Sequence, residues 1–184
     1  MRFLNVHRIA ISLRKYRQWH RWIGISIAIL ILLSSLTGIL LAWKKNVSVL
    51  QPPTQNSSFT ETSDWLSISD ISKRAEKALL AHTQLEAVSI DRMDVRPDKG
   101  IVKVNFEQGY WEVQLDGYSG EVLSIARRHS DWIEQVHDGS IISDLFKLLT
   151  MNVLGVGLLI LMASGIWLWL GPRKMREIKK RQEA

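Results

Sequence analysis

Two long stretches without a charged side chain constrain this chain more than any other feature of its sequence. The first runs from Trp22 to Trp43 and the second from Thr150 to Gly171, and each contains 22 residues. A helix of this length rises about 33 Å and can cross a hydrocarbon core of about 30 Å. The core helix of a soluble protein is rarely so long and so uniformly apolar. The sequence therefore predicts two transmembrane helices, at residues 22–43 and 150–171.

The first run could instead belong to a secretory signal sequence. The apolar region of such a signal usually has about 7 to 15 residues and precedes a small-residue cleavage site. Here the run is longer, and Trp43, Lys44 and Lys45 follow it. We therefore expect a retained membrane anchor.

The distribution of charge predicts the orientation of the two spans. Residues 1–21 carry six basic side chains and no acidic one, and residues 172–184 carry six basic and two acidic ones. Residues 44–149 carry 12 basic and 16 acidic side chains. Basic flanks indicate that both termini lie in the cytoplasm and the middle segment outside. The net charge of +6 thus reflects membrane topology, and we expect no nucleic-acid partner.

The chain has no cysteine, which excludes disulfides, thiolate metal sites and thiol chemistry. The middle segment combines one helical pattern with several alternating ones. Ser69 or Asp70 could cap a helix that places Ile71, Ala75, Ala78 and Leu79 on one face. About four strands follow, joined by turn-forming sequences. We expect the helix to cover one face of an antiparallel sheet and the acidic side chains to lie on its solvated face.

These patterns together predict an α+β membrane protein with two transmembrane helices and one small extracytoplasmic domain. The expected organisation is a basic amphipathic segment at 1–21, a transmembrane helix at 22–43, an extended linker at 44–65, an α+β domain at 66–126, an interfacial segment at 127–149, a second transmembrane helix at 150–171 and a basic tail at 172–184. Gly171 and Pro172 are expected to end the second helix. Small residues within the spans, among them Gly157, predict close packing of the two helices.

Three stretches resemble the PepSY domain and its associated transmembrane helices. They are "WHRWIGISIAILILLSSLTGILLAWKK", "YWEVQLDGYSGEVLSI" and "VHDGSII" with the later "GLLILMASGIWLWLGPRK". Their order around an alternating middle domain carries the resemblance, which involves most of residues 19–174. Larger relatives have four or more spans, and some are ferrisiderophore reductases that carry haem. The resemblance therefore implies a link to iron or siderophore uptake, and haem b as a conceivable cofactor.

Haem b commonly takes an axial imidazole on each face of the iron, and His20 and His137 are the candidate ligands. One span separates their levels by about 30 Å, so they cannot share an iron within one chain. In a two-fold dimer, two His20 side chains could hold one haem and two His137 side chains a second. Without haem, His20 would belong to an aromatic and basic interfacial collar, and His137 would bond the turn that follows it.

Two main functions therefore stay open, besides a purely structural subunit of a larger complex, which would show as co-purifying partners. The first is a module with a binding or accessory role outside a bacterial cytoplasmic (inner) membrane, with a periplasmic protein or a siderophore as its ligand and no catalysis. The second is a haem-bearing electron-transfer subunit, a component of a ferrisiderophore reductase, that acts as a dimer. A homodimer or a larger membrane complex would be compatible with either function. No pattern in the sequence indicates catalytic residues.

Overall fold

The computed structural model describes the backbone of residues 2–183 and the side chains of residues 7–181. The side chains of residues 1–6 and 182–184, at the ends of the two predicted basic segments, lie outside the described part. The chain divides into two compact units. The helical unit comprises the residues up to Leu36 and those from Val136 onward, and the sheet unit runs from Thr37 to Gln135.

Two long helices dominate the helical unit. The helix α1 (Arg2–Ala42) runs without a break through the predicted basic segment and the first uncharged run, and α4 (Asp144–Glu183) contains the second run. Both are long and apolar enough to cross a membrane, as predicted, and only 11% of each apolar window is buried. A core helix of a soluble protein would bury most of its apolar side chains. This exposure favours lipid as the surroundings of both helices.

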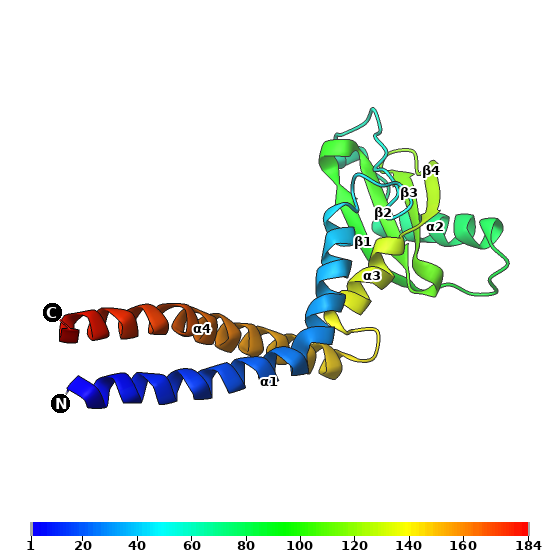
Figure 1. The fold of residues 1–184 in the computed structure, drawn as a ribbon. Coiled ribbons are helices and arrows are strands. Elements are labelled where there is room, and N and C mark those ends of the chain that lie inside the picture. The colour runs from blue at the N-terminus through cyan, green and yellow to red at the C-terminus, as the bar shows by residue number, and fades with distance from the viewer. Residues whose placement is uncertain (1, 184) are drawn as a thin grey trace. The chain divides into compact units, whose positions relative to one another are not determined.

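The contact between α1 and α4, which lie side by side in Figure 1, repeats every seven residues. Three pairs define this seam: Leu13 with Gly171, His20 with Ser164, and Ile27 with Gly157. Seven residues make two helical turns, so the pairs lie on one face of each helix, as in antiparallel coiled-coil packing. A Cβ atom on Gly157 would lie 2.7 Å from Ile27 Cδ1. Glycine therefore lets the helices approach closely, as the small residues of the sequence predict.

The prediction that Gly171 and Pro172 end the second helix is wrong. The helix α4 continues through Pro172 to Glu183. Proline removes one backbone hydrogen bond, but neighbouring groups can compensate for this loss in membrane helices. Gly171 acts instead at the seam, where a Cβ atom would lie 2.5 Å from Leu13 Cδ2.

The sheet unit contains the helix and the antiparallel sheet that the sequence predicts. The strands β1 (Ile90–Arg96), β2 (Ile101–Phe106), β3 (Trp111–Asp116) and β4 (Val122–Arg127) follow one another in the sheet in chain order. Short 3-10 turns, η2 (Pro97–Lys99) and η3 (Gln108–Tyr110), join the first three strands. The helix α2 (Ile68–His82) lies against one face of the sheet (Figure 1).

A single apolar core lies between α2 and the sheet. Ile71, Ala75 and Leu79 form the buried face of the helix, as predicted, whereas Ala78, which was expected on the same face, is only partly buried. They pack against side chains of the two central strands, namely Val102, Val104, Phe106, Val113 and Leu115. The helix begins earlier than expected, because Ser67 is its cap and accepts a hydrogen bond from Asp70 N at 3.1 Å. The Ser67 hydroxyl also donates to the Asp70 carboxylate at 2.6 Å. Ser69 and Asp70, the expected caps, therefore lie inside the first turn of the helix.

The expectation of a solvated second sheet face is wrong for the central strands. All six residues of β2 are buried, and the polar side chains of the second face are buried with them: Lys103, Asn105, Glu112 and Gln114. The predicted linker covers this face. Gln55 N donates to Gln114 Oε1 at 2.8 Å, and Gln114 Nε2 donates to Pro53 O at 3.0 Å. The segment after α1 is thus an extended cover that is hydrogen-bonded to the sheet.

The predicted interfacial segment contains a helix of its own. The helix α3 (His129–Asp138) follows β4 after a single residue, Arg128, and begins the approach to α4. Its buried residues in the sheet unit are Ser130 and Ile133. Ser130 N donates to Leu50 O at 2.7 Å, which joins the start of α3 to the segment after α1.

Candidate functional site

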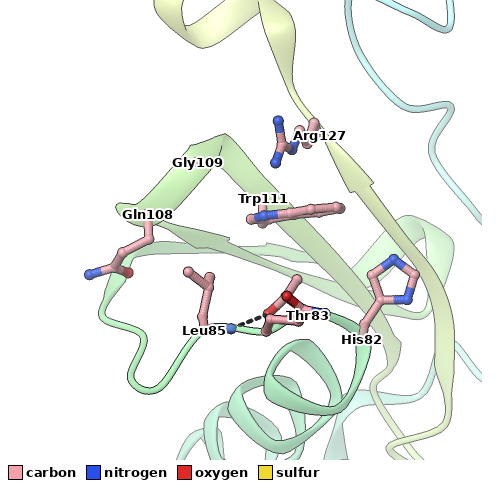
Figure 2. A pocket seen from close by; sticks show the side chains of 8 residues that line it. His82, Thr83, Leu85, Gln108, Gly109, Trp111 and Arg127 are labelled. Carbon is pink, nitrogen blue, oxygen red and sulfur yellow. Dashed lines mark hydrogen bonds between the residues drawn. The ribbon is translucent and has the colours of Figure 1, made fainter.

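A pocket of about 400 Å³ opens in the sheet unit where α2 ends and β3 begins. The Trp111 indole forms its centre (Figure 2). The Arg127 guanidinium carbon lies 4.8 Å from the centroid of this ring and covers one of its faces. His82 meets the same ring edge-on, with ring centroids 5.5 Å apart. We call this site the Trp111 pocket.

The backbone explains why these side chains meet. Trp111 and Arg127 are direct partners across the antiparallel β3–β4 pair, and His82 is the last residue of α2. Gly109 and Tyr110, in the turn before β3, have positive φ angles. This conformation turns the chain sharply, so that β3 begins directly at Trp111. A cation stacked on an indole leaves an aromatic surface with a positive charge beside it. This arrangement suits the binding of a planar anion.

Polar groups on the other walls of the Trp111 pocket are fixed by local hydrogen bonds. Gln108 Oε1 accepts from Ser89 N at 2.8 Å, and Thr83 Oγ1 donates to Leu79 O at 2.8 Å. Figure 2 shows Thr83 and Leu85 across the Trp111 ring from Arg127. The pocket therefore offers a fixed aromatic floor with an amide at its edge. Fixed groups of this kind favour recognition of a ligand.

No local sequence pattern indicates the Trp111 pocket. The His82 side chain is exposed to solvent, but it contacts the Trp111 ring. The signal that could have found the pocket is the register of the last hairpin. The turn "DGYSG" and a shift of register between Gln114 and Leu115 together pair Trp111 with Arg127.

A buried ionic network lies on the polar face of the sheet. Glu112 Oε2 accepts from Arg128 Nη1 at 2.6 Å, and Lys103 Nζ lies 3.5 Å from Glu112 Oε1. The side chain of Glu112 is fully buried, and that of Lys103 is 3% exposed. Lys103 also donates to Thr54 Oγ1 at 2.8 Å, and Arg128 binds Asp131 at 3.1 Å. The expectation that Glu112 lies on a solvated face is therefore wrong.

The network shifts the proton affinities of its two cations in opposite directions. Burial lowers the pKa of Lys103, and this effect outweighs the opposing attraction of Glu112. Burial also acts to lower the pKa of Arg128, but hydrogen bonds and charges from Glu112 and Asp131 raise it overall. One carboxylate thus holds two cations in the interior, which makes Glu112 the centre of this network.

His20, the first predicted haem ligand, lies in the seam of the helical unit. Its Nδ1 atom is 2.8 Å from Ser164 Oγ, which also lies 3.0 Å from Leu161 O. The Ser164 hydroxyl can donate its one proton either to Leu161 O or to His20 Nδ1. In the first arrangement Ser164 accepts from Nδ1–H, and the lone pair of His20 is on Nε2. The neighbours Trp19 and Trp22 are 67% and 58% exposed, so they point away from the seam. His20 therefore does not share the outward orientation of this collar.

His137, the second predicted ligand, lies in the last turn of α3 and lines a mostly apolar pocket of about 240 Å³. Leu33 and Ser34 of α1 line the same pocket, together with Phe146 of α4. Residues 33 and 34 follow His20 by 13 and 14 positions, about 20 Å of helix. The structure therefore does not bring His20 and His137 together within one chain.

The fold and these sites define a class of protein: a membrane protein in which two packed helices accompany a small α+β domain. Comparison with protein families makes the assignment specific. The model of a family described as "PepSY-associated TM region" matches residues 17–184, and the chain belongs to this family. A comparison with curated protein sequences found no match. The sheet unit corresponds in its helix and four-stranded meander to the PepSY domain that the sequence predicts.

Proposed function

We propose that this protein is a membrane-anchored binding module whose PepSY domain captures an anionic, aromatic ligand in the Trp111 pocket outside the cytoplasmic membrane. The observation that carries the proposal is the stacking of Arg127 on Trp111, with His82 at the edge of the ring. The resemblance to ferrisiderophore reductases directs the choice of ligand. A ferric catecholate siderophore combines aromatic faces with negative charge, so it suits both the indole and the guanidinium.

The topology of the proposal follows from the charge distribution. The segments 1–21 and 172–184 are strongly basic, and the segment 44–149 is acidic. This bias supports cytoplasmic termini and a periplasmic PepSY domain. The Trp111 pocket would then face the compartment through which siderophores pass. The accessory role is to hold or present the ligand beside the membrane.

Ligand titration of the full chain in detergent tests the proposal. A ferric catecholate complex should bind saturably. Arg127→Gln should weaken this binding roughly tenfold or more, because the variant lacks the cation that stacks on Trp111 and attracts the anionic ligand. Trp111→Phe should weaken it less, since an aromatic ring remains. Trp132→Ala is the matched control, because Trp132 lies in the sheet unit but does not line the pocket. Equal binding by wild type and Arg127→Gln would refute the proposal.

A second candidate is the haem-bearing dimer, and the hydrogen bond of His20 favours it. Imidazoles that bind metals usually donate their other ring N–H to a fixed acceptor, and the Ser164 hydroxyl, 2.8 Å from His20 Nδ1, is placed to be such an acceptor. The apolar pocket beside His137 likewise suits the edge of a porphyrin. His20 and His137 would hold haem at two separate levels, each with its copy in a second chain. When bound, haem would supply one-electron transfer.

An absorption spectrum of protein purified from haem-replete cells tests this second candidate. We expect a Soret band that His20→Ala or His137→Ala diminishes and that the exposed control His7→Ala leaves unchanged. Ser164→Ala should retain the band but shift the reduction potential, because the imidazole loses its acceptor. Colourless wild-type protein would exclude haem and leave the binding module as the function.

A further inference from the structure

We propose that a second site in the PepSY domain, a basic cleft, binds the phosphate of an anionic phospholipid headgroup. The cleft has a volume of about 420 Å³ and lies apart from the Trp111 pocket, with which it shares no lining residue. Six cationic side chains line it: Lys44, Lys45, Arg96, Lys99, Lys103 and Arg128. Asp94 and Asp98 are the acidic residues of its wall.

The positive charge of the basic cleft contrasts with the rest of the segment between the spans. Residues 44–149 contain 12 basic and 16 acidic side chains. Half of these basic side chains and only two of the acidic ones line the cleft. The remainder therefore carries six basic and 14 acidic side chains. A domain that is acidic elsewhere thus concentrates its cations around one concave surface, which attracts an anion to that surface.

The floor and the rim of the cleft have different roles. Lys103 and Arg128 form the floor and are held by the buried carboxylate of Glu112. At the rim, Lys44 is only loosely paired with Glu134, at 3.5 Å, and both side chains are exposed to solvent in part. Lys45 forms no ion pair with any residue whose side chain the structure describes. Loose pairs on the surface contribute little in water, so the rim can exchange them for a phosphate.

Two further rim cations complete the set. Arg96 lies 3.9 Å from Asp94, a long and exposed pair, and Lys99 donates to the amide oxygen of Asn56 at 3.2 Å. Neither side chain is therefore neutralised by a close carboxylate. The carboxylates of Glu112 and Asp131 balance the two floor cations. The four rim cations therefore supply the positive charge and the donors that can close around an anionic group.

The position of the rim in the chain favours a lipid as the source of the phosphate. Lys44 and Lys45 directly follow Trp43, the last residue of the first uncharged run. Lysines at the end of a membrane span extend to the level of the headgroups. The basic cleft begins with these two residues, so it opens where phosphodiesters are abundant. This argument holds for either leaflet and does not depend on the ligand of the Trp111 pocket.

Binding of a short-chain lipid to the full protein in an uncharged detergent tests the proposal. Dihexanoyl phosphatidylglycerol should bind saturably by calorimetry, and Lys45→Gln/Lys99→Gln should weaken this binding on the order of thirtyfold. These two side chains belong to the rim, so the buried network stays intact. Lys73→Gln/Lys77→Gln is the matched control, because it removes two exposed charges from α2 and should leave the affinity unchanged.

Two other ligands distinguish the sources of the anion. Dihexanoyl phosphatidylcholine has the same chains and phosphate but no net charge, and it should bind at least tenfold more weakly. Inorganic phosphate should also bind more weakly, because it lacks the acyl chains that can contact the apolar end of the first span. Equal affinity for inorganic phosphate and the anionic lipid would overturn the lipid assignment in favour of a soluble anion. An unchanged affinity in Lys45→Gln/Lys99→Gln would overturn the site itself.

Discussion

At the scale of single residues, Glu112 is the side chain on which the interior of the PepSY domain depends most. It is fully buried and binds both Lys103 and Arg128. Glu112→Ala leaves two buried cations short of a counter-charge, a change that typically costs about 3 to 5 kcal/mol. We expect the thermal midpoint of the detergent-solubilised chain, followed by tryptophan fluorescence, to fall by on the order of 10 °C or more. Glu107→Ala, at an exposed site after β2, should leave it nearly unchanged.

Asp116 makes a pH-dependent contribution in the turn between β3 and β4. Burial acts to raise the pKa of Asp116, but hydrogen bonds from Ser57, Ser119 and Tyr118 outweigh it and hold this pKa below its ordinary value of 3.8. Because the folded state binds the proton less tightly, ionised Asp116 stabilises the fold above pH 3.8, and this contribution disappears as the pH falls through the folded pKa.

The lowered pKa of Asp116 predicts how the thermal stability of the chain depends on pH. Asp116→Asn should lower the thermal midpoint at pH 6, and the difference from wild type should shrink as the pH approaches 3. Thermal unfolding of both proteins over this pH range measures the effect. A difference that stays constant over the whole range would show that the carboxylate charge of Asp116 does not stabilise the turn.

At the scale of elements, the seam between α1 and α4 provides a matched pair of glycines. A Cβ atom on Gly157 would lie 2.7 Å from Ile27 Cδ1, whereas one on Gly155 would meet nothing within 4 Å. Gly157→Val should therefore overpack the seam and destabilise the chain by about 1 to 3 kcal/mol. Gly155→Val, in the same helix, should have little effect. Thermal unfolding in detergent compares the two variants.

A second substitution tests whether the clash between residue 157 and Ile27 causes the loss of stability. If the clash with Ile27 is the cause, Ile27→Ala should restore part of the stability that Gly157→Val loses, although Ile27→Ala alone is destabilising. Additive losses in the double variant would show that the two residues do not meet. The same outcome would remove one of the three pairs that define the seven-residue repeat of the seam.

The elements also show what the sequence could and could not predict. The alternation of Val102, Val104 and Phe106 indicates the core face of β2, because the periodicity of a strand is local. Alternation in β3 places Glu112 on the opposite face, which was expected to be solvated. That expectation is wrong because the segment around Pro53 and Gln55 covers this face. That cover depends on contacts between residues distant in the chain, which periodicity cannot detect.

The candidate sites follow the same rule. The sequence singled out His20 by its residue type, but its interfacial neighbours gave no sign that it faces α4. The spacing of seven residues between Leu13, His20 and Ile27 could have indicated a shared helix face. The Trp111 pocket needed the register of the β3–β4 hairpin as well as the end of α2. Local sequence patterns therefore cannot predict sites that are assembled from several elements.

At the scale of the whole molecule, the proposed topology can be tested directly because the chain contains no cysteine. A membrane-impermeant maleimide applied to intact spheroplasts should label Glu61→Cys and Lys77→Cys, which are exposed sites of the PepSY domain. Lys15→Cys and Arg173→Cys should react only after the membrane is permeabilised. The physical reason for this expectation is the excess of Lys and Arg at both ends, which favours a cytoplasmic location of these segments. Labelling of Lys77→Cys and Arg173→Cys from the same side of the membrane would exclude this orientation, and a siderophore could then no longer reach the Trp111 pocket from the periplasm.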